Sequence, residues 1–339
     1  MSARALPAKA TRIGTSGIWL APHATYTDSG VFDREGWVRL MDHCAELRVG
    51  TISHSLLADP WAQSLQQRKE LVELMTETVG GRVPVAVYAT AHSVGTTIDL
   101  VGHAGAIGAD FALLNCPFEW AATEASALRW FHTVLDRTGM DISIVIYNSA
   151  HSGILLRAGA VSELADQPQV VAVLNGAGTF ESSVELHRAV GDRILVSDPF
   201  ERHQLRAWEA YGQPILMTST ASLLMQTARW TPIRDYIALA HAGEMEAAQE
   251  LFDRIEPLRA LWESVYAHSA LDVEHAAHPL AQTRYWQQAM GLPAGPPTRP
   301  LAEPSTAQKR RILTGLAPYV ERWGVEEPWN RQVRIIGGI

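Results

Sequence analysis

Short apolar runs alternate with amphipathic stretches along the first two thirds of the chain. Several runs, such as VPVAV, ISIVIY and VVAVL, are apolar at nearly every position, which is typical of parallel strands covered on both faces. Eight runs of this kind are expected to form strands. They cover residues 17–23, 50–55, 83–90, 110–116, 142–148, 170–175, 194–198 and 214–220.

The segments between these runs carry helix signals. Ser64 and Gln67 have the spacing of a capping box, in which each side chain bonds the other residue's backbone. Thr123 is placed to cap a second helix, and Gly139 to end it. Eight strand–helix units in about 220 residues predict an α/β fold, a TIM (β/α)8 barrel, with a doubly wound open sheet as the rival.

After residue 220 the strand signals stop and the pattern becomes helical. We expect helices over 236–242, 244–268 and 277–290, and a last helix that opens on the capping pair Ser305 and Gln308 after a proline-rich link. The sequence therefore predicts three parts. They are a flexible N-terminal tail over 1–14, the barrel over 15–231 and a C-terminal helical domain over 232–339.

Composition narrows the class of protein. Of 339 residues, 47% are hydrophobic and 19% are charged, which is enough apolar material for a full core. Acidic residues outnumber basic ones, 36 to 28, and no basic run is available to neutralise nucleic-acid phosphates. No segment has the apolar length of a membrane span or the apolar core of a signal peptide. We expect a cytoplasmic protein that binds neither nucleic acid nor membrane.

Several segments resemble one enzyme family. They are Gly30, Phe32 and Asp33, the RVPVAV strand, GAD followed by a strand ending in CPF, the IVIYN strand and the late GLPAGPPTRPL. In order and spacing these segments are similar to the dihydrodipicolinate synthase and N-acetylneuraminate lyase family. The resemblance implies a homo-oligomeric barrel, a homotetramer or homodimer. It also implies an enzyme that forms or cleaves a bond next to a carbonyl through a lysine Schiff base on a 2-keto acid.

The departures from the family pattern concern its catalytic residues. The family lysine on the sixth strand, in a pattern like IKEASG, falls on Leu174. The chain has three lysines, Lys9, Lys69 and Lys309, and all lie outside the expected strand ends. The GTTGE loop that holds the substrate carboxylate reads SLLAD here, PYY reads PFE, and YNVPGRTG is shortened and lacks its arginine. Of the family's catalytic set, only Tyr147 is retained. Because the lysine is missing, we expect a mechanism without a Schiff base.

Polar side chains gather at the expected carboxyl ends of the strands, where barrels place their active sites. The predicted catalytic residues, acting as proton donors and acceptors, are Tyr147, Glu119, His54 and His92. The predicted substrate-binding residues are His23, Asn115, Asn148, His151, Asn175, Asp198 and Thr218. The candidate ligands for a divalent metal are His23, His54, His92, Glu119 and Asp198.

Each of these residues also has a plainer interpretation. The histidines can be hydrogen-bonded pocket residues that hold no metal, because chain position does not show whether their ring nitrogens converge. Between Phe118 and Trp120, Glu119 would have its charged form destabilised and serve as a base near neutral pH. It could equally be a solvent-facing acid at the start of a helix.

The sequence predicts a lyase-type enzyme of the aldolase or dehydratase kind. Its substrate would be a small carbonyl-containing molecule, neutral or weakly charged because the carboxylate loop is lost, and catalysis would proceed by acid–base or metal-assisted enolisation. No cofactor is certain, and a divalent metal is an open alternative. Two other functions also stay open: a non-catalytic ligand-binding homologue, and a metal-dependent hydrolase or isomerase on the same barrel.

Overall fold

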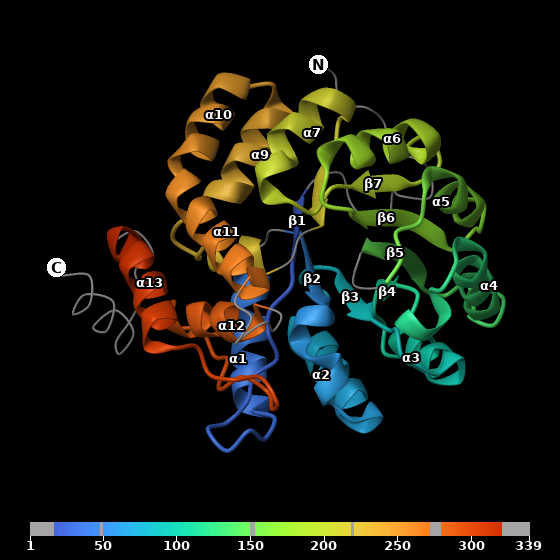
Figure 1. The fold of residues 1–339 in the computed structure, drawn as a ribbon, viewed down its shortest axis with the longest axis horizontal. Coiled ribbons are helices and arrows are strands. Elements are labelled where there is room, and N and C mark those ends of the chain that lie inside the picture. The colour runs from blue at the N-terminus through green and yellow to red at the C-terminus, as the bar shows by residue number, and fades with distance from the viewer. Residues whose placement is uncertain (1–16, 48–49, 150–152, 218–219, 272–278, 321–339) are drawn as a thin grey trace.

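The computed structural model describes residues 17–47, 50–149, 153–217, 220–271 and 279–320. Its centre is one parallel sheet in the order β7-β6-β5-β4-β3-β2-β1-β8, curved into a nearly closed barrel that helices surround (Figure 1). The strands are β1 (Gly17–Leu20), β2 (Gly50–His54), β3 (Val85–Tyr88), β4 (Phe111–Leu114), β5 (Ser143–Ser149), β6 (Val170–Gly176), β7 (Leu195–Ser197) and β8 (Ile215–Met217). All eight lie where the hydrophobic pattern placed them, and the predicted TIM (β/α)8 barrel is confirmed.

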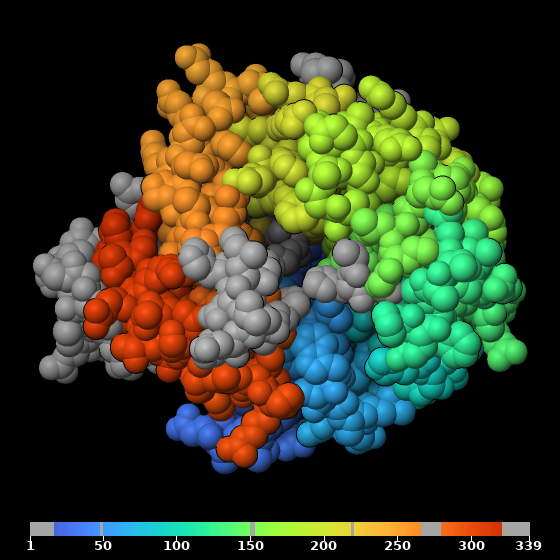
Figure 2. Space-filling view, in the orientation of Figure 1, coloured from blue at the N-terminus to red at the C-terminus, as the bar shows by residue number. Residues whose placement is uncertain are grey.

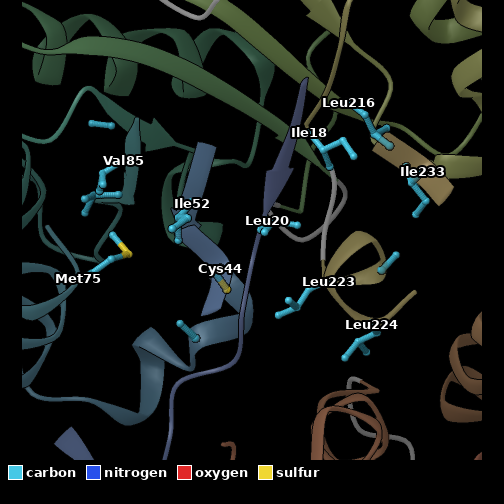
Figure 3. Close-up of a cluster of buried hydrophobic side chains, with 14 of the residues drawn as sticks. Ile18, Leu20, Cys44, Ile52, Met75, Val85, Leu216, Leu223, Leu224 and Ile233 are labelled. Carbon is cyan, nitrogen blue, oxygen red and sulfur yellow. The ribbon is translucent and has the colours of Figure 1, made fainter. Parts of the chain in front are cut away.

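Side chains along each strand point alternately into the barrel and toward the helices. Trp19 on β1 and Phe111 on β4 meet inside the barrel, with their ring centroids 5.3 Å apart. The opposite faces of the strands pack against the helix layer. Figure 3 shows this outer layer, in which strand and helix side chains meet at Ile18, Leu20, Ile52, Val85, Leu216, Cys44 and Met75.

The barrel closes between β7 and β8 through a side chain. The Ser197 hydroxyl donates to the Ile215 carbonyl at 3.1 Å and accepts from the Met217 N–H at 2.9 Å. Ser197 is fully buried, so these two bonds satisfy polar groups that water cannot reach.

The helices of the barrel layer are α1 (Arg34–Glu46), α2 (Leu65–Val79), α3 (Val94–Ala106), α4 (Glu124–Leu135), α5 (Ala158–Ala165), α6 (Phe180–Val190), α7 (Gln204–Tyr211) and α8 (Ala221–Leu224). The capping box predicted at Ser64 and Gln67 begins α2 as expected. Thr123 caps α4 but forms its box with Ser126, and the helix ends at Leu135, short of Gly139.

The C-terminal helices are α9 (Pro232–Ala242), α10 (Met245–Arg254), α11 (Glu256–Leu271), α12 (Leu280–Ala289) and α13 (Thr306–Leu316). The expected single helix over 244–268 is wrong, because α10 and α11 are separated at Ile255. Pro257 lacks an N–H and its ring would clash with the carbonyl four residues earlier, so it fits only the first turn of a new helix. The predicted cap of α13 by Ser305 and Gln308 is confirmed.

These helices share a hydrophobic cluster with the strands. α9 packs against α7 and β1, and residues of α11, α12 and α13 belong to the same cluster as Ile18 and Leu20. A shared cluster does not divide the chain into two domains, so the domain boundary expected between residues 231 and 232 stays a prediction. Within the described residues, no helix combines the length and apolar character needed to cross a membrane.

A buried ion pair joins α12 to the loop after β2. Arg284 donates through Nη2 to the Asp59 carboxylate, and both side chains are only 1% exposed. Arg284 Nη1 also donates to the Ala24 carbonyl, and to the Ala294 carbonyl at 2.9 Å. One guanidinium thus ties the end of β1, the loop after β2 and the segment after α12 together.

We expect Arg284→Leu to lower the free energy of unfolding by about 3–5 kcal/mol, because it leaves the Asp59 carboxylate buried without a cationic partner. Arg39→Leu is the control: Arg39 and Glu35 form an exposed pair at 3.9 Å, worth at most about 1 kcal/mol. Urea denaturation of the two variants measures the difference. Equal losses in the two variants would show that the Arg284 contact does not stabilise the fold.

Candidate active site

A cavity of about 410 Å³ opens at the carboxyl ends of the strands. Its walls come from six strands and the loops that follow them, and α11 lies over one side. Figure 2 shows the surface hollowed near the centre of this face. The cavity therefore lies where barrels of this kind carry their active sites.

Inward-pointing strand residues form the floor of the cavity. Tyr147 on β5 lies directly opposite Leu174 on β6 in the strand register, and both line the cavity. Trp19, Ser53 and Tyr88 contribute from β1, β2 and β3. Aromatic and aliphatic side chains predominate on this floor, interrupted by a few hydroxyl groups.

The two tyrosines keep their protons. Burial raises the pKa of Tyr147, against an opposing hydrogen bond with the Ser149 side chain. Burial also raises the pKa of Tyr88 to about 12, against the nearby charge of Arg68, and the neighbouring Tyr147 adds to the rise. Both phenols are therefore neutral hydrogen-bond donors at physiological pH.

Glu201, Arg259 and Tyr236 form a buried cluster that fixes α11 over the cavity. Arg259 donates to both carboxylate oxygens of Glu201, through Nε at 2.6 Å and through Nη2 at 3.1 Å. The Tyr236 hydroxyl donates to Glu201 Oε1 at 2.9 Å. The Arg259 and Glu201 side chains are each 3% exposed, so the bidentate pair is shielded from water.

The charges around the cavity are paired. Arg259 also bonds Glu256, and Arg202 bonds Glu263 at the rim. Among the described residues that line the cavity there is no lysine.

Two of the chain's lysines lie away from the cavity. Lys69 pairs with Asp99, and Lys309 pairs with Glu303. Lys9 lies outside the described residues.

The structure turns His54 away from the cavity, so the expected placement is corrected. Its neighbours Ser53 and Ser55 line the cavity, and strand alternation sends His54 to the opposite side, where it is fully buried. Neither ring nitrogen has a hydrogen-bond partner among the described residues. Burial, with the nearby charge of Arg68, lowers the pKa of His54 to about 3.

His92 and Glu119 pair with each other at the surface instead of lining the cavity. His92 Nδ1 lies 2.7 Å from Glu119 Oε1, and the side chains are 81% and 48% exposed. The hydrogen bond from His92 lowers the pKa of Glu119, which is the opposite of the shift that an apolar pocket would cause. Of the two interpretations of Glu119, the solvent-facing acid matches its surroundings.

His23 and Asn115 are buried next to the cavity but do not line it. His23 Nδ1 lies 2.9 Å from the Leu57 carbonyl, and the His23 N–H donates to Gln287 Oε1 at 3.3 Å. Asn115 is hydrogen-bonded to the Tyr88 side chain. Of the candidate metal ligands, His92 and Glu119 face each other. The described residues contain no group of three or more His, Cys, Asp or Glu side chains able to hold a metal ion.

Three of the predicted binding residues do come together, behind the barrel wall. Asn148 Nδ2 donates to Asn175 Oδ1 at 3.0 Å, and Asn175 Nδ2 donates to Ser183 Oγ at 3.1 Å. The Ser183 hydroxyl donates to Asp198 Oδ2 at 3.0 Å, and the same oxygen lies 3.0 Å from His203 Nδ1. His203 lines the cavity. The predicted residues His151 and Thr218 lie outside the described residues.

The sequence interpretation missed several cavity residues. Tyr88 could have been found by counting every second residue along β3 from a known inward-pointing position. His203 and Glu201 follow β7 in a short 3-10 helix, and Arg259 comes from α11, where no local pattern points to the cavity.

His54 makes stability depend on pH. Its pKa is lower in the folded protein than the usual 6.5, so stability is full above about pH 6.5 and is lost as pH falls toward about 3. Between about pH 7.5 and about pH 5.5, wild type should lose about 1 kcal/mol more than His54→Leu. Urea denaturation at both pH values tests this expectation. An equal pH dependence of the two proteins would contradict it.

Comparison with known proteins agrees with this architecture. The model of the dihydrodipicolinate synthetase family matches residues 15–314. A 4-hydroxy-tetrahydrodipicolinate synthase from Halorhodospira halophila is 27% identical over 215 residues, which are 63% of this chain and 67% of the relative. One from Methanothrix thermoacetophila is 24% identical over 313 residues, 89% of this chain and 97% of the relative.

The fold is also similar to that of solved structures. The crystal structure of dihydrodipicolinate synthase from Aquifex aeolicus matches with a TM-score of 0.78 at 18% identity, covering 91% of this chain and 99% of the other. The family match spans both the barrel and most of the C-terminal helices. The chain belongs to the dihydrodipicolinate synthetase family of lyase-type enzymes.

Proposed function

We infer that this protein is a lyase-type enzyme that makes or breaks a bond next to a carbonyl without a lysine Schiff base. One observation carries the proposal. Tyr147 lies beside Leu174 in the cavity, and no lysine is among the described residues that line it. The resemblance to the family pattern implies that the lysine position falls on Leu174, and a hydrocarbon side chain cannot form an imine.

The cavity residues support enolisation by hydrogen bonding. Tyr147 and Tyr88 keep their protons because burial raises the pKa of both hydroxyl groups. A carbonyl oxygen held against Tyr147 would accept a hydrogen bond that strengthens as negative charge develops on it. The surrounding apolar side chains exclude water, which increases the strength of such a bond.

The charges around the cavity favour a neutral substrate. Arg259 and Arg202 are already bonded to carboxylates, so among the described residues neither is available to a substrate carboxylate. The floor carries Trp19, Tyr88 and Leu174, which would pack against a hydrocarbon ring or chain. We therefore propose a neutral carbonyl compound with an apolar group as the substrate class.

The oligomeric state and location stay predictions. A homotetramer or homodimer is what the resemblance implies, and one structure of similar fold is presented as the first monomeric variant of a dihydrodipicolinate synthase, with a TM-score of 0.74 at 20% identity. A cytoplasmic location is proposed on composition alone.

Sodium borohydride added with pyruvate should leave the wild-type protein without a covalent adduct, because the proposal places no amine in the cavity. Leu174→Lys is the matched positive control, since it places an amine beside Tyr147 and should be trapped. Intact mass spectrometry distinguishes the two results. A borohydride-trapped adduct on wild type would refute the proposed mechanism.

Acetophenone in D₂O tests enolisation directly, because it is neutral, carries an apolar ring and exchanges protons only next to its carbonyl. Wild type should accelerate this exchange, and Tyr147→Phe should slow it by about 100-fold, the usual size of one oxyanion donor. Tyr285→Phe, a tyrosine on α12 outside the cavity lining, should match wild type. Proton NMR measures the rate, and no acceleration by wild type would favour the non-catalytic alternative.

A further inference from the structure

His203 is a titratable group on the cavity wall that the proposed function has not used. It belongs to the 3-10 helix Glu201–His203 after β7, and its side chain is 19% exposed. Phe180 and Phe200 pack against the imidazole, each with a ring centroid 5.6 Å away. The ring is therefore held in place on two sides while one edge reaches the cavity.

Asp198 fixes how the imidazole is oriented. His203 Nδ1 lies 3.0 Å from Asp198 Oδ2. Because a carboxylate accepts hydrogen bonds, this contact favours the neutral tautomer that carries its proton on Nδ1 and leaves Nε2 unprotonated. Asp198 is itself 1% exposed and is held by the Phe200 N–H on Oδ1 at 3.0 Å and by the Ser183 hydroxyl on Oδ2. His203 Nε2 has no hydrogen-bond partner within the part of the chain that the structure describes.

The polar chain behind the barrel wall holds this pair. Asn148 is anchored to the Leu156 backbone by two bonds, of 2.8 and 3.0 Å, and passes a hydrogen bond to Asn175, which bonds Ser183. In this series of hydrogen bonds, Asn148, Asn175 and Ser183 each donate to the next residue toward Asp198. The series ends at the Asp198 carboxylate, which also accepts from the imidazole. The other acids and bases of the cavity, Glu201 and Glu263, are already bonded to arginines.

We propose that His203 Nε2 is the general base that removes the proton next to the substrate carbonyl, and that Asp198 positions it. This inference rests on the proposed function. The C–H bond breaks, its proton moves to Nε2, and its electron pair forms the enolate double bond. The resulting oxygen charge is stabilised by the Tyr147 hydroxyl. In one outcome the enolate carbon then bonds to the carbon of a second carbonyl, and His203 gives the proton to the alkoxide oxygen that forms. In the other, the enolate expels a leaving group from the carbon next to the enolate carbon, and His203 gives the proton to that leaving group.

The acetophenone exchange assay tests this assignment. His203→Gln should slow exchange by about 100-fold or more, the usual contribution of a positioned base. His187→Gln, a histidine that stacks on Tyr211 away from the cavity lining, should match wild type. His203→Ala should recover exchange when imidazole is added, which a variant that has lost its fold would not do.

Asp198→Asn tests the positioning role separately. Nitrogen-15 NMR of labelled histidine should show His203 protonated on Nδ1 in wild type, and a changed tautomer balance in Asp198→Asn. Slower exchange should accompany that change.

The outcomes separate the two proposals. If wild type accelerates exchange but His203→Gln keeps the wild-type rate, or His203→Ala is not rescued by imidazole, the inference fails and the proposed function stands. A wild-type His203 protonated on Nε2 would likewise overturn the role of Asp198. If wild type gives no acceleration, the proposed function fails, and the inference fails with it.

Discussion

The bidentate contact between Arg259 and Glu201 is the interaction on which the cavity depends. It joins α11, far along the chain, to the loop after β7, and both side chains are almost completely shielded from water. Removal of either partner would leave a charge in a medium that cannot solvate it. The positive charge of Arg259 and the negative charge of Glu201 also neutralise each other. Charged residues therefore line the cavity without giving it an electrostatic preference for an ionic ligand.

The arginines and glutamates that line the cavity are paired with one another, and Leu174 lies opposite Tyr147. We therefore propose that the site acts through hydrogen bonds and proton transfer in a largely apolar space. Burial raises the pKa of the Tyr147 phenol, so the hydroxyl keeps its proton and donates a hydrogen bond. That hydrogen bond to a developing oxyanion is stronger where water is excluded. A solved structure named as a dihydrodipicolinate synthase has a similar fold, and one fold can support different chemistries through the residues at its strand ends.

The sequence predicted the fold well and the site in part, for reasons that lie in particular residues. Buried parallel strands need apolar runs, so all eight were visible, as were the caps at Ser64 and Ser305. Near a strand end, however, neighbouring residues face opposite sides. Tyr147 points into the barrel, whereas Asn148 and His54 point out of it, and residue type alone does not reveal this. His203 and Arg259 reach the cavity only through tertiary packing.

The seam between β7 and β8 has a consequence for motion. Between β7 and β8, the Ser197 hydroxyl takes the place of backbone-to-backbone hydrogen bonds. Among the described residues, this strand pair therefore has fewer backbone hydrogen bonds than the neighbouring pair β6–β7. Local unfolding begins where such bonds are sparse. Asp198 and the turn that carries His203 follow directly after this strand. Beyond Ser197, the Gln213 side chain holds the Asp198 backbone, so this seam rests on side-chain bonds. We therefore expect it to open more readily than the neighbouring strand pairs, on the side where a ligand would meet the imidazole.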